Sequence, residues 1–137
     1  MMETAMIRAL LLLAPIALAG CASDRYAERQ RAHDETKLAR LLGDRVPGEP
    51  QSCLDSRMTN GSEPVGSQTI LYFQGSTVYR NDLIGQCSGL RSDDIPVITS
   101  HSGRLCRGDM IRTVSRGAPN VTTGGCALGD FVPYRER

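Results

Sequence analysis

The strongest structural signal in the chain is the sequence QTILYFQGSTVYR, residues 68–80. Two runs rich in β-branched and aromatic side chains, residues 68–73 and 77–80, flank the short segment Gln74-Gly75-Ser76. Such runs on either side of a glycine turn are typical of a β-hairpin. In the first run, large apolar side chains occupy both odd and even positions, and successive side chains of a strand point to opposite faces. The sequence therefore predicts a hairpin that is partly apolar on both faces.

The chain after residue 46 continues in short runs of the same kind. Residues 59–67 and 115–125 combine glycine, asparagine and proline and predict loops, the first either a plain loop or a loop around one weak strand residue. Short strands separated by turns favour a mainly β fold, either a sandwich or a small barrel of the OB-like or SH3-like kind. We place this globular domain at residues 46–137. Its further strands are expected over residues 51–58, 95–99, 105–106, 110–114 and 126–134, the last interrupted at Gly129.

A helix is expected before this domain. In KLARLLG, residues 37–43, Leu38, Leu41 and Leu42 share one helix face, and Gly43 stands where glycine commonly ends a helix. We predict a tether over residues 21–45, helical over about 24–42, whose last turns dock on the domain. The alternative is a solvated tether with a nascent helix, because residues 22–36 are dense in charge.

The first residues of the chain predict where the protein is located in the cell. Residues 9–19 carry no charge and follow Arg8. The run is shorter than the roughly 20 residues that span a bilayer and fits the apolar region of a secretory signal. It ends in Leu18-Ala19-Gly20-Cys21, which resembles the lipobox of bacterial lipoproteins. The alternative is a chance cysteine after an ordinary signal peptide.

The lipobox resemblance implies a signal peptide over residues 1–20, with Met1 or Met6 as its start. In that family the signal is cut before the cysteine and the cysteine sulfur carries a diacylglycerol, so the resemblance implies lipidation of Cys21. Aspartate after the cysteine favours the inner membrane in Gram-negative members. The residue here is Ala22, which implies the periplasmic face of the outer membrane, with contact to the membrane through the anchor at Cys21.

Four further cysteines follow in the expected domain. An even number of cysteines in an oxidising compartment indicates disulfides. None of them forms a C-x-x-C pair, which argues against a thioredoxin-like redox site and a zinc knuckle. Three pairings are possible, and the residues alone leave them open. The cysteines are Cys53, Cys87, Cys106 and Cys126.

Several short motifs resemble a group of small uncharacterised proteobacterial cell-envelope lipoproteins. The resemblance covers residues 37–135 and carries no assigned functional residues. Some members of the group keep only counterparts of Cys53 and Cys106, which implies a pair between these two and leaves Cys87 with Cys126. The serious alternative is Cys87 with Cys106, which would fasten a local hairpin. The motifs are GEP at 48–50, SCL at 52–54, LC at 105–106 and LGDFVPY at 128–134.

The composition excludes one class of partner. The net charge is +1, basic and acidic residues are interspersed, and the chain has no Trp and only two Phe. The sequence therefore offers neither the basic field nor the aromatic platform typical of nucleic-acid binding. We expect no nucleic-acid partner.

Candidate catalytic groups are few. His33 lies in the charged tether and His101 in a turn-like segment, Ser100 to Gly103. We expect the pair Asp93-Asp94 to stabilise a turn by accepting backbone hydrogen bonds. The same role is expected for Asp109 and Asp130, which each follow a glycine. We expect no catalytic residue, metal or cofactor.

The sequence thus favours a non-enzymatic envelope protein that binds another envelope protein or supports the envelope itself. A version of this hypothesis is an enzyme inhibitor that uses the loop 115–125. The alternative function is a periplasmic hydrolase using His101 with a carboxylate.

Overall fold

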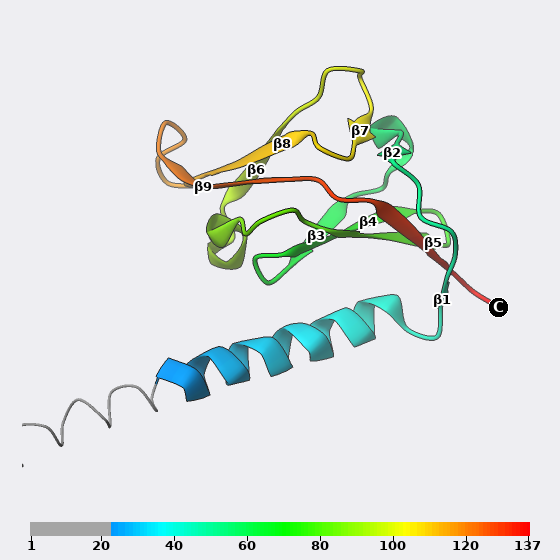
Figure 1. The fold of residues 1–137 in the computed structure, drawn as a ribbon, viewed down its shortest axis with the longest axis horizontal. Coiled ribbons are helices and arrows are strands. Elements are labelled where there is room, and N and C mark those ends of the chain that lie inside the picture. The colour runs from blue at the N-terminus through cyan, green and yellow to red at the C-terminus, as the bar shows by residue number, and fades with distance from the viewer. Residues whose placement is uncertain (1–22) are drawn as a thin grey trace, which may run out of the picture. The chain divides into compact units, whose positions relative to one another are not determined.

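The computed structural model describes residues 23–137, shown as a ribbon in Figure 1. It divides the chain into two compact units between Thr36 and Lys37. A helix runs over residues 23–42, close to the predicted range, and of the first unit the structure describes the largely exposed helical residues 23–36. Gly43 ends this helix with a φ of 58°. The second unit is mainly β, as predicted.

The predicted hairpin of residues 68–80 lies inside a five-stranded antiparallel sheet with the order β1-β10-β5-β4-β3. Gln74 pairs with Thr77, and the turn between them uses Gly75 with a φ of 57°, a conformation that glycine adopts without steric cost. The sheet consists of β1 (Val46–Pro47), β3 (Ser62–Val65), β4 (Thr69–Gln74), β5 (Thr77–Asp82) and β10 (Phe131–Arg135).

The prediction of a loop over residues 59–67 was wrong for β3. Pro64 weakens the strand signal there because proline cannot donate a ladder hydrogen bond. The sheet tolerates it because β3 is an edge strand with one neighbour, β4. An edge position leaves half of the backbone groups of a strand outside the ladder, so a missing N–H costs little.

A second sheet has three antiparallel strands in the order β6-β8-β9, and a two-stranded sheet pairs β2 with β7. The predicted first strand over 51–58 is shorter than expected and gives way to a 3-10 helix, and the end of the predicted loop 115–125 belongs to β9. These elements are β2 (Cys53–Leu54), η1 (Ser56–Met58), η2 (Ser88–Ser92), β6 (Ile95–Thr99), β7 (Leu105–Cys106), β8 (Met110–Val114) and β9 (Thr122–Ala127).

The strand predicted over residues 126–134 is two strands on two different sheets, β9 and β10, with the predicted interruption at Gly129 between them. The fully buried Asn81 fixes this crossing. Its side-chain amide donates to the Gly129 carbonyl at 2.9 Å, and its carbonyl accepts from the Gly129 N–H at 2.9 Å. A Cβ at position 129 would lie 2.0 Å from the Asp82 carbonyl oxygen, so the chain crosses where only glycine fits.

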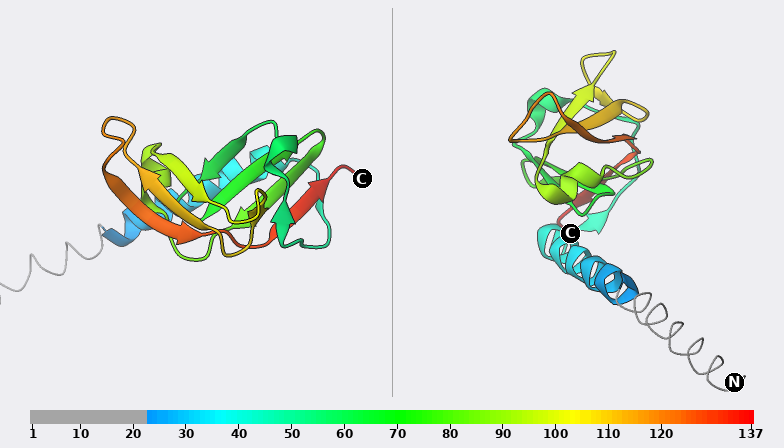
Figure 2. Two further views of the ribbon diagram at one scale, coloured as in Figure 1. Left: turned by 90° about the horizontal axis from the view of Figure 1, so that it is seen from above. Right: turned by 90° about the vertical axis from the view of Figure 1, so that its left-hand side faces the viewer.

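The main hydrophobic core lies between the two larger sheets. Tyr72 and Phe131 of the five-stranded sheet meet with ring centroids 5.7 Å apart, and Ile111 of β8 faces them from the other layer. Figure 2 shows the five-stranded sheet and the β6-β8-β9 sheet as separate layers. The sheets do not close into a barrel, so of the two predicted architectures the sandwich is the one present. β3 and β6 are edge strands because neither has a second ladder partner.

The opposite face of the five-stranded sheet has its own cluster. Leu71 and Val78 are buried there against Leu42, and Leu38 and Leu41 pack beside them. This contact covers the second apolar face of the hairpin. It also explains why the compact unit begins at Lys37, upstream of the boundary expected at residue 46.

Lys37 fastens the end of the helix to β3. Its Nζ donates to the Pro64 carbonyl at 2.8 Å and lies 2.6 Å from a Glu63 carboxylate oxygen. The lysine therefore fixes the helix where its apolar residues begin.

Two disulfides crosslink the second unit. Cys53 is joined to Cys106 and Cys87 to Cys126, the two pairs that the resemblance implied. Cys53 and Cys106 are register partners on β2 and β7 and are half-buried. Cys87 and Cys126 are 0% and 5% exposed and belong to the core. The first disulfide fastens a two-residue ladder, and the second joins the segment after β5 to β9.

Shortening Leu42 to alanine should lower the free energy of unfolding by about 2–4 kcal/mol, because the site is buried between the helix and the sheet. Urea denaturation followed by circular dichroism measures this. Arg40→Ala, at an exposed position of the same helix, is the control and should change stability little. Equal effects of the two substitutions would contradict the docking of the helix.

Graded reduction should open the two disulfides in order. We expect Cys53 and Cys106 to react with a soluble dithiol first, because a buried disulfide is inaccessible to the attacking thiolate. Alkylation and peptide mapping at increasing reductant concentration measure the order, and in denaturant the difference should shrink. A non-reduced map with Cys87 joined to Cys106 would refute the pairing.

Candidate functional site

The residues singled out from the sequence do not meet at one place. Cys21 and the lipobox lie outside the described residues. His101 is exposed in the loop between β6 and β7. No hydrogen bond or ion pair joins His101 to a carboxylate within the described part of the chain. His33 is exposed on the helix, with Nδ1 3.7 Å from Asp34.

The aspartates fill structural positions. Asp93 ends η2 with a φ of 60°, and its carboxylate lies 3.5 Å from the Arg116 guanidinium. Asp109 accepts a hydrogen bond from the Cys106 N–H at 2.8 Å. Asp130 forms an ion pair with Arg107. Each of these carboxylates orders a turn or a loop, and over residues 23–137 no group of three or more histidine, cysteine or acidic side chains could hold a metal ion.

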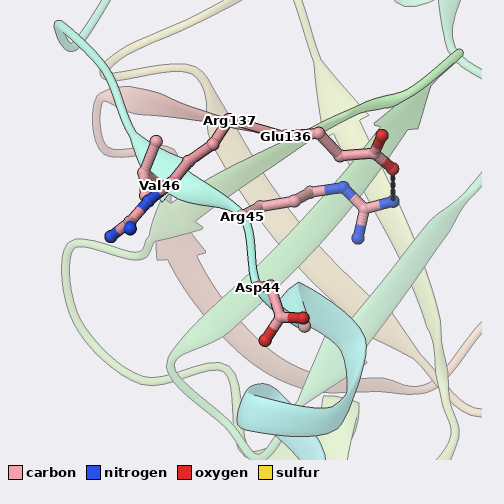
Figure 3. A pocket seen from close by; sticks show the side chains of 6 residues that line it. Asp44, Arg45, Val46, Glu136 and Arg137 are labelled. Carbon is pink, nitrogen blue, oxygen red and sulfur yellow. Dashed lines mark ion pairs between the residues drawn. The ribbon is translucent and has the colours of Figure 1, made fainter.

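An open pocket of about 500 Å³ lies between residues 43–46 and the last two residues of the chain. Figure 3 shows Arg45 reaching toward Glu136, with 3.9 Å between the charged groups. Arg45 also donates to the Leu42 carbonyl at 3.2 Å and the Ser76 carbonyl at 3.0 Å. This arginine therefore fastens the helix end, and the exposed or half-buried lining offers no sequestered acid, base or nucleophile.

Tyr72 carries a buried hydroxyl with no hydrogen-bond partner among the described residues. Burial raises the pKa of the Tyr72 hydroxyl above its ordinary value, because the ionised form would lose its hydration. The ring is 4% exposed and packs against Phe131 in the core. Its position inside the sandwich makes it a packing residue that substrate would not reach.

The β6–β8–β9 sheet presents a different kind of surface. Side chains alternate between the two sides of a strand. Ile98, Ile111 and Cys126 turn inward to the core. Their neighbours in the strands therefore form the opposite side of the sheet, which we call the outer face. It comprises Ile95, Val97, Thr99, Met110, Arg112, Gly125 and Ala127, with Ile84 joined to the sheet edge by a bridge to Ala127. Val114, the register partner of Ile95, follows an irregularity in the ladder after Thr113 and is buried, so the face ends before it.

The outer face is mostly apolar. Met110 is 57% exposed, Ile84 50% and Ile95 37%. Solvated faces of antiparallel sheets normally carry polar side chains. A contiguous apolar patch on the surface of a soluble protein commonly marks an interaction site. The outer face is therefore the candidate binding surface.

Arg112 is the one charged residue of the outer face. It stands between Val97 on β6 and Gly125 on β9, its register partners. The residue is exposed, and no carboxylate pairs with it in the part of the chain that the structure describes. A Cβ at Gly125 would meet only a backbone oxygen at 3.8 Å, so the surface beside Arg112 is low and open.

This surface was not among the features predicted from the sequence. Its signal was present in the alternation of residues 110–113, MIRT, in which Ile111 and Thr113 are buried and Met110 and Arg112 exposed. In the run 95–99, IPVIT, the sequence does not distinguish the inward from the outward side chains, because apolar residues occupy both sides of the strand. Only the pairing register shows which residues lie side by side.

Among the helices that the structure describes, none is both long and apolar enough to cross a membrane. No curated protein and no solved structure matches the chain. A family model does match it, over residues 3–127. This match covers most of the chain, which therefore belongs to DUF6491, a family of unknown function.

Proposed function

We propose that this protein is a lipid-anchored envelope protein that works by binding, without catalysis, at the periplasmic face of the outer membrane. The observation that carries the binding role is the apolar outer face of the β6–β8–β9 sheet. Exposed apolar surface lowers solubility, and a partner that covers it gains the free energy of burial, about 25 cal/mol per Å².

The absence of a catalytic arrangement among the described residues supports a binding role over the hydrolase alternative. A general base must reach the proton that it abstracts, and in hydrolases of the triad type a carboxylate holds the catalytic histidine in place. His101 is exposed and has no carboxylate partner in residues 23–137. Asp109 and Asp93, which lie near it in sequence, are used in a turn and in an ion pair.

The resemblance of residues 18–21 to a lipobox supports the proposed location at the membrane. Each buried CH₂ of a lipid contributes about 0.8 kcal/mol, and two or more chains hold a protein stably at a membrane. The charged residues 23–36 are largely exposed, so they suit a segment that lies in water between an anchor and a domain. A tethered domain would meet other envelope proteins at high effective concentration.

Replacing Cys21 with alanine should abolish labelling by a fatty-acid analogue in growing cells, because the sulfur that accepts the lipid is gone. The variant should also move from the membrane fraction to the soluble periplasmic fraction. Ser23→Ala is the control and should label like the parent. Equal labelling of Cys21→Ala and the parent would refute the anchor.

A further inference from the structure

We infer that the outer face binds a protein partner that presents a carboxylate to Arg112, surrounded by apolar side chains. The inference rests on the proposed function and specifies its surface and partner. Arg112 lies at the middle of the face, with Met110 and Ile84 on one side and Ile95 on the other. The surface of the partner would therefore carry a carboxylate at its centre, opposite Arg112, and apolar side chains around that carboxylate.

The chemistry of arginine selects the central contact. Its planar guanidinium forms two parallel hydrogen bonds with a carboxylate, a geometry that gives both energy and orientation. A partner that covered Arg112 with apolar atoms alone would bury an unpaired charge at a large cost. Because Arg112 has no carboxylate partner within residues 23–137, we expect the partner to supply the carboxylate that pairs with it best. Arginine at the centre of an interface ringed by apolar contacts is a common hot-spot arrangement.

A second copy of this chain does not fit the face. A two-fold axis through the middle of the outer face would bring Arg112 against Arg112, and like charges at an interface cost several kcal/mol. Pairing through the free edge of β6 is also disfavoured. Pro96 has no N–H to donate, and proline is one of the devices that keep edge strands from pairing.

A membrane surface fits less well than a protein. Surfaces that bind anionic lipids gather several lysines or arginines, each worth about 1 kcal/mol. Arg112 is the single cation of the outer face. The side chains of the face stand on paired strands, which hold them in fixed positions and suit them to a complementary protein surface.

Site-specific photo-crosslinking in intact cells tests the inference on the full chain. A photoreactive amino acid replaces Val97 or Met110 on the outer face, and Ser76 at the exposed β4–β5 turn serves as the control position. We expect one discrete adduct with a second protein from positions 97 and 110 and none from 76. Adding Arg112→Glu should reduce the adduct by about tenfold or more. Arg112→Lys should reduce it less, because the charge remains.

The partner's chemistry is then tested directly. The adduct peptide identified by mass spectrometry should lie beside an aspartate, a glutamate or a chain-terminal carboxylate. Reversing an identified acidic side chain to arginine should restore crosslinking to the Arg112→Glu protein. Thermal unfolding of purified Arg112→Glu should match the parent, since the residue is exposed, and this excludes misfolding as the cause of the loss.

The crosslinking experiment separates failure of the carboxylate contact from failure of the proposed binding role. A protein adduct that persists unchanged with Arg112→Glu would overturn the carboxylate contact but leave the proposed binding role intact. No adduct from positions 97 and 110 would overturn the binding role itself. Adducts of the chain with itself, or with lipid, would overturn the inferred partner in favour of a homodimer or a membrane surface.

Discussion

The β4–β5 hairpin is apolar on both of its faces, and this requirement for burial on two sides determines what surrounds it. On one face, Ile70 and Tyr72 pack into the core of the sandwich. On the other, Leu71 and Val78 pack against Leu42 and its neighbours at the end of the helix. A single additional layer would leave one of these faces in water. The second sheet and the last turns of the helix are therefore both parts of the folded unit.

The second sheet is small, and specific ties compensate for its size. The buried disulfide between Cys87 and Cys126 connects the segment after β5 to β9. The Asn81 side chain fixes the backbone at Gly129, where the chain leaves one sheet for the other. A small domain buries a limited fraction of its surface, so covalent and buried polar ties matter more than in a large one. With its inner side committed to the core, the sheet keeps an apolar outer face available for a partner.

Local sequence signals predicted the elements with strong periodicity. The hairpin of residues 68–80 and the helix ending at Gly43 follow from side-chain type and spacing alone. β3 was missed because Pro64 weakens its strand signal, and an edge position that tolerates proline is visible only in the assembled sheet. The pairing of Cys53 with Cys106 needed a resemblance, since three pairings satisfy the same sequence.

The candidate surface could not be predicted for a similar reason. It depends on which residues of β6, β8 and β9 are register partners, and register is a long-range property. Arg112 reads as an ordinary exposed arginine until Val97 and Gly125 are placed beside it. The expectation of turn roles for the aspartates needed only local patterns, and the contacts of Asp93 and Asp109 agree with it.

Native-state amide hydrogen exchange, resolved by residue, tests the central role of the hairpin most directly. If burial on both faces holds the fold together, the slowest-exchanging amides should lie in β4 and β5, because these are released only by global unfolding. The amides of the β6 edge should exchange through smaller openings. Slowest exchange in the β6–β8–β9 sheet, with β4 and β5 exchanging earlier, would contradict the account.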